Sequence, residues 1–158
     1  MHILKAIKSK KQSEDFCLIS VGQGHTQKEV EQLASRLGVN ERVKFLGQRV
    51  DVPKLLNAMD MFFLPSLFEG FPIVAIEAQA AGLPLVVADT ITKEVELTDL
   101  VYRLPINNGA KAWAEIYYQI KYTKVNRAEY ASIVERKGFD IKHSAQILQD
   151  IYIKCTTK

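Results

Sequence analysis

Short runs rich in β-branched and aromatic residues alternate along this chain with stretches of helical periodicity. Five such runs occur, at residues 16–21, 43–46, 61–64, 85–88 and 100–104. The first, third and fourth are nearly continuous, which is typical of strands that are covered on both faces. Strands that alternate with helices through short connections predict an α/β fold, a doubly wound parallel sheet with helices on both faces.

The helical stretches carry start and stop signals. Thr26 and Glu29 have the spacing of a capping box, in which each side chain accepts a hydrogen bond from the other residue's backbone N–H. Gly38 ends the helix that this box begins. Residues 73–81 form a further helix, and Gly82 ends it.

A helical pattern also opens the chain, at residues 3–10, ahead of the first apolar run. In a doubly wound domain the first strand and its phosphate loop normally precede such a helix, so we expect a domain that lacks its first strand. From residue 110 onward the patterns are helical. The last of them, residues 140–154, places Ile141 and Leu148 on one apolar stripe.

Length and composition exclude several classes of protein. The 158 residues suffice for one domain with a core, residues 1–158, and 47% hydrophobic residues exclude intrinsic disorder. No run approaches the roughly 18 apolar residues that a membrane span needs. A net charge of +3 is too small for a dedicated nucleic-acid binder. The start of the chain is charged too early for a secretory signal, and the two cysteines do not have the spacing of metal ligands. Both features predict the reducing cytoplasm as the location.

Four lysines near the start form the clearest basic cluster. They are Lys5, Lys8, Lys10 and Lys11. We interpret them as a solvated helix face, with weak attraction to an anionic membrane surface as the alternative.

Gly22 and Gly24 follow the first apolar run. A dinucleotide-binding fingerprint would need a third glycine at position 27, which is Gln27, so the full pattern is not present. Two interpretations stay open for the pair. One is a tight turn that needs flexible backbone, and the other is a close approach of the backbone to a ligand at the carboxyl edge of the sheet.

The segment at residues 65–84 is the most specific motif. It follows a buried strand, turns at residues 69–72 and enters a helix near Ile73, which places backbone N–H groups where a diphosphate can bind. Glu69 lies in the loop ahead of the helix, and Glu77 lies one turn inside it. Carboxylates suit sugar hydroxyls because each can accept two hydrogen bonds from a diol. The alternative is one acid at a helix N-terminus and one solvated glutamate.

The pattern Pro-Ser-x-x-Glu-Gly-Phe-Pro, followed by Glu77-Ala-x-Ala-Ala-Gly-x-Pro, resembles the signature of retaining glycosyltransferases with the GT-B fold. Residues 43–47 and 60–66 resemble preceding segments of the same family in the right order. Residues 89–100 are similar to its capsular and exopolysaccharide branch. The resemblance implies the Rossmann-like, C-terminal half of such an enzyme, a nucleotide-sugar-binding domain that is a fragment of a two-domain protein.

The resemblance also implies a role for each matching residue. Glu69, the catalytic candidate, would bind the hydroxyls of the donor sugar, and Glu77 would hydrogen-bond the ribose. The other implied substrate-binding residues are Gly70, Phe71, Ile73 and Val74 at the diphosphate, Gly22 and Gly24 on the phosphate side of the cleft, and Leu46 and Gly47 beside the base.

The implied reaction is retaining, metal-independent transfer of a hexosyl or N-acetylhexosaminyl group during synthesis of a surface polysaccharide. A UDP-sugar is the expected donor substrate, and no cofactor or metal is expected. The expected partners are a missing N-terminal acceptor domain and a lipid-linked glycan acceptor, but no nucleic acid. The expected location is the cytoplasm or, peripherally, the inner face of the membrane.

Without the acceptor domain and the upstream phosphate-binding basic residues, this chain alone is expected to transfer nothing. Two alternatives stay open at this point. One is a nucleotide-sugar epimerase or hydrolase of the same fold, because a fold does not fix its chemistry. The other is a non-enzymatic, flavodoxin-like interaction domain.

Overall fold

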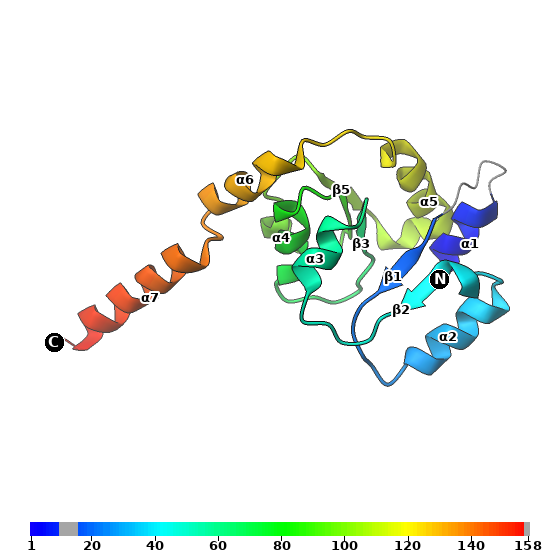
Figure 1. The fold of residues 1–158 in the computed structure, drawn as a ribbon, viewed down its shortest axis with the longest axis horizontal. Coiled ribbons are helices and arrows are strands. Elements are labelled where there is room, and N and C mark those ends of the chain that lie inside the picture. Colours follow the sequence, from blue (N-terminus) through cyan, green and yellow to red (C-terminus); the bar gives the residue numbers. More distant parts are fainter. Residues whose placement is uncertain (10–15, 157–158) are drawn as a thin grey trace. The chain divides into compact units, whose positions relative to one another are not determined.

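The computed structural model describes residues 1–9 and 16–156, in which loops connect helices and parallel strands (Figure 1). The chain divides into two compact units, each described here by itself. Unit 1 comprises Met1–Lys54 and Ile106–Thr123, and unit 2 comprises Leu55–Pro105 and Lys124–Lys158. None of the helices in the described ranges is long and apolar enough to cross a membrane.

The α-helices follow the predicted order. They are α1 (His2–Ser9), α2 (Gln27–Arg36), α3 (Val52–Asn57), α4 (Ile73–Ala80), α5 (Gly109–Ile120), α6 (Tyr130–Arg136) and α7 (Ile141–Thr156). The strands are β1 (Leu18–Ser20), β2 (Val43–Phe45), β3 (Phe62–Leu64), β4 (Leu85–Ala88) and β5 (Val101–Leu104). Short 3₁₀ helices are η1 (Asn40–Arg42), η2 (Lys93–Val95), η3 (Ile106–Asn108) and η4 (Arg127–Glu129).

All strand pairs are parallel, which confirms the predicted fold class. In unit 1, β1 pairs with β2, and Leu18 lies opposite Val43. In unit 2 the order is β3-β4-β5, with Leu85 of the central strand opposite Phe62 on one side and Val101 on the other. Within each unit the pairing is that of a parallel α/β sheet, and the expected absence of a first strand stays a prediction.

The core of unit 1 joins the opening helix to the first strand pair. Leu4 of α1 packs with Ala34, Val39 and Val43. The hydroxyl of Tyr118 on α5 donates to the Ile7 carbonyl at 2.6 Å, which ties α5 to α1. These contacts explain why a helix of only eight residues is stable at the start of the chain, since short helices depend on packing.

One member of the predicted basic cluster makes a structural contact. The Nζ of Lys8 donates to the Gly38 carbonyl at 2.5 Å, at the end of α2. Lys5 is exposed. Lys10 and Lys11 lie outside the described residues.

The core of unit 2 surrounds β4, all of whose residues are buried. Leu85 and Val87 pack with Ala75 and Ile76 of α4 and with Val134 of α6. A strand that is covered on every side reads as a continuous apolar run, as the sequence predicted.

The predicted capping box at the start of α2 is wrong. Thr26 is the N-cap residue, but its side chain makes no capping hydrogen bond. Its backbone has φ −86° and ψ 2°, whereas a capping side chain reaches the helix from an extended backbone. The side chain of Gln27 donates instead to Glu31 at 2.8 Å.

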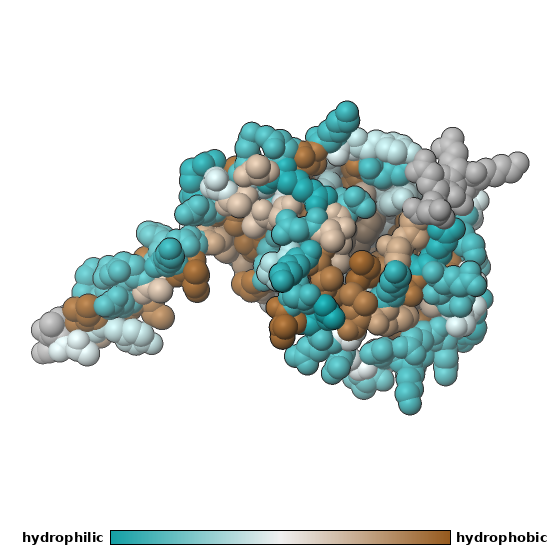
Figure 2. Space-filling model, viewed as in Figure 1, coloured by the Kyte–Doolittle hydropathy of each residue, from teal (hydrophilic) through white to brown (hydrophobic). Residues whose placement is uncertain are grey.

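The last helix, α7, has no buried residue. Its predicted apolar stripe is therefore open to solvent, and Leu148 and Tyr152 are 52% and 64% exposed. Figure 2 shows hydrophobic side chains among hydrophilic ones along this helix, at the left of the view.

Candidate functional site

α4 carries three of the ten predicted site residues, and the loop between β3 and α4 carries three more. This loop begins after the buried Leu64 and ends at Pro72, which is the N-cap residue of α4 with φ −74° and ψ 98°. No side chain in the described part of the chain caps this end, and the Pro72 carbonyl accepts a hydrogen bond from the Ala75 N–H at 2.9 Å. The first N–H groups of an α-helix have no partner within the helix, so the start of α4 can bind an anion.

The predicted residues of this segment lie at the surface of unit 2. Glu69, Gly70 and Glu77 are exposed, and Val74 is half-buried. Ile73 is 60% exposed and lies one helical turn before Glu77, so both belong to the same open face of α4. Both carboxylates are therefore available to a ligand.

Phe71 makes a contact that the sequence did not reveal. Its ring stacks on that of Phe139, with ring centroids 5.8 Å apart and planes 2° apart. Phe139 lies between α6 and α7, about 70 positions later in the chain. Stacked aromatic pairs add to stability beyond the area they bury. This contact fixes the residue that precedes the N-cap of α4.

The second group of predicted residues lies in unit 1, after the carboxyl ends of β1 and β2. The Gly22 N–H donates to the Gly47 carbonyl at 2.8 Å, and the Leu46 N–H donates to the Ser20 carbonyl at 2.9 Å. Gly22 has φ 128° and Gly47 has φ 63°, values that favour glycine. Gly24 accepts from the Gln27 N–H at the start of α2. The structure thus brings Gly22, Leu46 and Gly47 together at the strand ends of unit 1, and Gly24 lies in the turn into α2.

An ion pair borders this second group. Arg49 donates to both carboxylate oxygens of Asp51, at 2.9 and 2.8 Å. This hydrogen bonding lowers the pKa of Asp51 below its usual value and raises that of Arg49. Asp51 directly precedes α3, so the pair fixes the connection from the turn at residues 46–49 to that helix.

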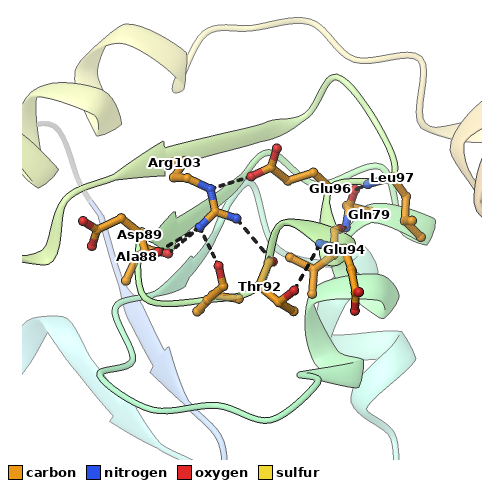
Figure 3. Close-up of polar contacts among 10 residues, drawn as sticks. Gln79, Ala88, Asp89, Thr92, Glu94, Glu96, Leu97 and Arg103 are labelled. Carbon is orange, nitrogen blue, oxygen red and sulfur yellow. Dashed lines mark hydrogen bonds and ion pairs between the residues drawn. The ribbon is translucent and has the colours of Figure 1, made fainter.

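Two polar residues that sequence reasoning missed organise the loop after β4 (Figure 3). Gln79 of α4 is fully buried. Its amide donates to the Val95 carbonyl at 2.7 Å and accepts from the Thr98 N–H at 3.0 Å. A glutamine between two alanines, on a helix whose other polar residue is the exposed Glu77, is the sequence signal that could have identified it.

Arg103 of β5 is the second of these residues. Its guanidinium donates to Glu96 at 2.5 Å and to a set of main-chain carbonyls in the loop. Those carbonyls are Ala88, Asp89, Ile91 and Thr92, at 3.1, 3.3, 2.7 and 3.3 Å. No group of three or more His, Cys, Asp or Glu within the described ranges is placed to hold a metal ion.

Comparison with known proteins assigns the chain to a class. The family described as Glycosyl transferases group 1 matches residues 1–116. The chain therefore belongs to this family, and its fold is the Rossmann-like half of GT-B glycosyltransferases.

Three curated relatives make the assignment more particular. A Bacillus subtilis protein that bears the name glycosyltransferase EpsF is 32% identical over 145 residues, which cover 90% of this chain and 38% of that protein. An Escherichia coli UDP-Gal:α-D-GlcNAc-diphosphoundecaprenol α-1,3-galactosyltransferase is 37% identical over 48% of this chain and 20% of its own length. The Vi polysaccharide biosynthesis protein VipC/TviE of Salmonella typhi is 41% identical over 43% and 12%. The chain thus spans well under half the length of these relatives.

Solved structures show the same fold. WaaG, a glycosyltransferase involved in lipopolysaccharide biosynthesis, is 23% identical with a TM-score of 0.72, over 90% of this chain and 39% of its own. Anabaena HepE in complex with UDP is 26% identical with a TM-score of 0.71, over 95% and 43%. The predicted family and fold are confirmed, as is the link to polysaccharide biosynthesis among the relatives.

Proposed function

We propose that this chain is the donor-binding half of a retaining, metal-independent glycosyltransferase that builds a surface polysaccharide. The observation that carries the proposal is the exposed, uncapped start of α4 with Glu69 and Glu77 on either side of it, in a chain of this family. The transferred group is a hexosyl or N-acetylhexosaminyl unit, and the donor is a UDP-sugar. The names of two relatives, one bound to UDP and one that uses UDP-Gal, support this donor class.

The residues of α4 and of the loop before it bind different parts of the donor. The backbone around Gly70, Phe71, Ile73 and Val74 holds the diphosphate at the positive end of the helix. When the bond from the sugar to the diphosphate breaks, negative charge grows on the leaving phosphate, and fixed N–H dipoles stabilise it without having to reorganise.

The two carboxylates recognise the two sugars of the donor. Glu77, one turn inside α4, accepts hydrogen bonds from the ribose hydroxyls. Glu69, in the loop, accepts them from the transferred sugar and fixes its orientation for reaction. In unit 1, Gly22 and Gly24 line the phosphate side of the donor site, and Leu46 and Gly47 border the base.

The proposed acceptor machinery belongs to a longer protein. An N-terminal domain binds a lipid-linked glycan acceptor, and the enzyme works in the cytoplasm, at the inner face of the membrane. The length of the relatives supports this part of the proposal, because they are more than twice as long as the chain. The chain alone then binds nucleotide weakly and transfers no sugar, since transfer needs donor and acceptor held in reactive geometry.

Calorimetric titration with UDP tests the nucleotide site. We expect Glu77→Ala to weaken UDP binding by about 1.5–3 kcal/mol, the usual loss for a hydrogen bond to a charged group. Glu135→Ala is the matched control, because Glu135 is an exposed glutamate on α6 of the same unit. Equal affinity of both variants for UDP, with the fold intact, would contradict the ribose assignment.

A further inference from the structure

A hydrogen bond joins the loop after β4 to the loop after β3. The hydroxyl of Thr90 donates to the Ser66 carbonyl at 2.6 Å. The two strands are parallel neighbours, with Leu64 opposite Val87, so both loops leave the same edge of the sheet. The bond therefore spans the edge at which open α/β sheets bind ligands.

The β3–α4 loop has little other packing ahead of its turn into the helix. Leu67 is 69% exposed and Phe68 is 95% exposed. Glu69 and Gly70 are exposed as well, and glycine adds backbone freedom. At the far end the loop is fixed by the buried Pro72. The bond at Ser66 fixes it at the near end, three residues before Glu69.

Thr90 stands on a turn that is itself fixed. Arg103 donates to the carbonyls on both sides of it, at Asp89 and Ile91. The Ile91 side chain is buried, and Glu96 holds the guanidinium in place. Because a guanidinium is a rigid, planar fork, several bonds to one group restrict the whole turn.

We propose that Thr90 and Arg103 form a brace that positions the donor loop. Arg103 fixes the turn after β4, Thr90 transmits that position to Ser66, and Glu69 is thereby held where it meets the donor sugar. This rests on the function proposed above. Thr90 and Arg103 are positioning residues, because they act on the donor through the β3–α4 loop. The brace should matter for a UDP-sugar more than for UDP, whose diphosphate and ribose meet α4 itself.

The test replaces Thr90 by valine, which has the same shape but no hydroxyl. We expect ¹⁵N order parameters of residues 67–70 to fall from rigid values, about 0.85, to about 0.6 or below, while those of β4 stay unchanged. Affinity is measured by calorimetry for UDP and for UDP-galactose, UDP-glucose and UDP-N-acetylglucosamine. For the UDP-sugar that the unaltered chain binds most tightly, we expect a loss of about three- to tenfold, and for UDP less than about twofold.

Three further variants make the result specific. Thr90→Ser keeps the hydroxyl and should restore both readouts. Thr123→Val makes the same chemical change at an exposed threonine of the other unit and should change neither. Arg103→Lys keeps the charge but loses the fork, and it should loosen residues 67–70 with Thr90 intact.

The outcomes separate the brace from the proposed function. Unchanged order parameters in Thr90→Val, or equal losses for UDP and UDP-sugar with a general loss of order in unit 2, would overturn the brace. Loosening confined to residues 88–92 in Arg103→Lys would overturn the role of Arg103. If the unaltered chain binds neither UDP nor any UDP-sugar, the proposed function and the ligand half of the inference fail. The order parameters then still decide whether Thr90 holds the loop.

Discussion

One face of α4, with Ile73 and Glu77, is open to solvent, whereas the opposite face, with Ala75, Ala78 and Gln79, is fully buried. The open face has few contacts to lose, and the buried face is packed on β4 and α6. The buried face therefore contributes to stability, and the open face stays accessible to a ligand. Substitutions on the open face should change ligand affinity with little effect on folding, and substitutions on the buried side should change stability first.

The sharpest test of the buried side is Gly82, which ends α4. It has φ +66°, and a Cβ there would lie 2.7 Å from the Cα of Arg127. We expect Gly82→Ala to destabilise the fold by about 2–5 kcal/mol, because left-handed strain and a backbone clash add together. Urea unfolding measures the loss.

Gly38 provides the control for this prediction. It has nearly the same φ, +67°, but a Cβ there would meet no atom of the described residues within 4 Å. Gly38→Ala should therefore cost only the strain, about 1–2 kcal/mol. Equal costs at both positions would show that the close approach of Arg127 to α4 contributes nothing.

Gln79→Met tests whether the buried amide holds the loop after β4. The substitution keeps the side-chain length but leaves the Thr98 N–H and the Val95 carbonyl without this partner. We expect a loss of about 2–3 kcal/mol in the free energy of unfolding. Gln119→Ala, at an exposed position of α5, should lie within about 0.5 kcal/mol of the unaltered chain. A neutral Gln79→Met would mean that the network in Figure 3 is dispensable.

Glu69→Gln tests the open side, in the loop ahead of α4. The change removes the charge and half of the accepting capacity while it keeps the shape. We expect UDP-sugar affinity to fall by about 1–2 kcal/mol, with UDP affinity and the unfolding midpoint nearly unchanged. Calorimetry with the two ligands measures the difference. Equal losses for UDP and UDP-sugar would remove the distinction between sugar and nucleotide contacts.

The smallest effect is expected at Tyr130 of α6. Burial and a hydrogen bond to Asp99, 3.0 Å long, raise the pKa of this phenol. The folded chain thus holds the phenol proton more tightly than the unfolded chain does. Its contribution to stability is complete below the unfolded pKa, about 10, and is lost as the pH rises through the folded pKa. Ultraviolet titration should show a late-ionising tyrosine that Tyr130→Phe removes. If Tyr130→Phe and the unaltered chain show the same late ionisation, the assignment to Tyr130 is wrong.

The two ends of α4 could be predicted from the sequence, and the buried polar contacts could not. The entry into α4 at Ile73 and its end at Gly82 follow from local backbone preferences, which depend on residues only a few positions away. Gln79 and Arg103 bind carbonyls and N–H groups that are 11 to 19 positions away, and no local pattern encodes such partners. The capping box failed for the opposite reason. The residues at positions 26 and 29 have the right types, but the backbone at Thr26 has another conformation.

The anchoring of the turn after β4 also bears on how this domain can change over evolutionary time. Arg103 binds main-chain carbonyls at residues 88, 89, 91 and 92, and every amino acid carries that acceptor. Exposed side chains beside the turn, such as Lys93 and Glu94, can therefore be replaced without dismantling its support. A turn that keeps its shape while its side chains vary is a place where a lineage can acquire a new ligand preference and leave the fold intact.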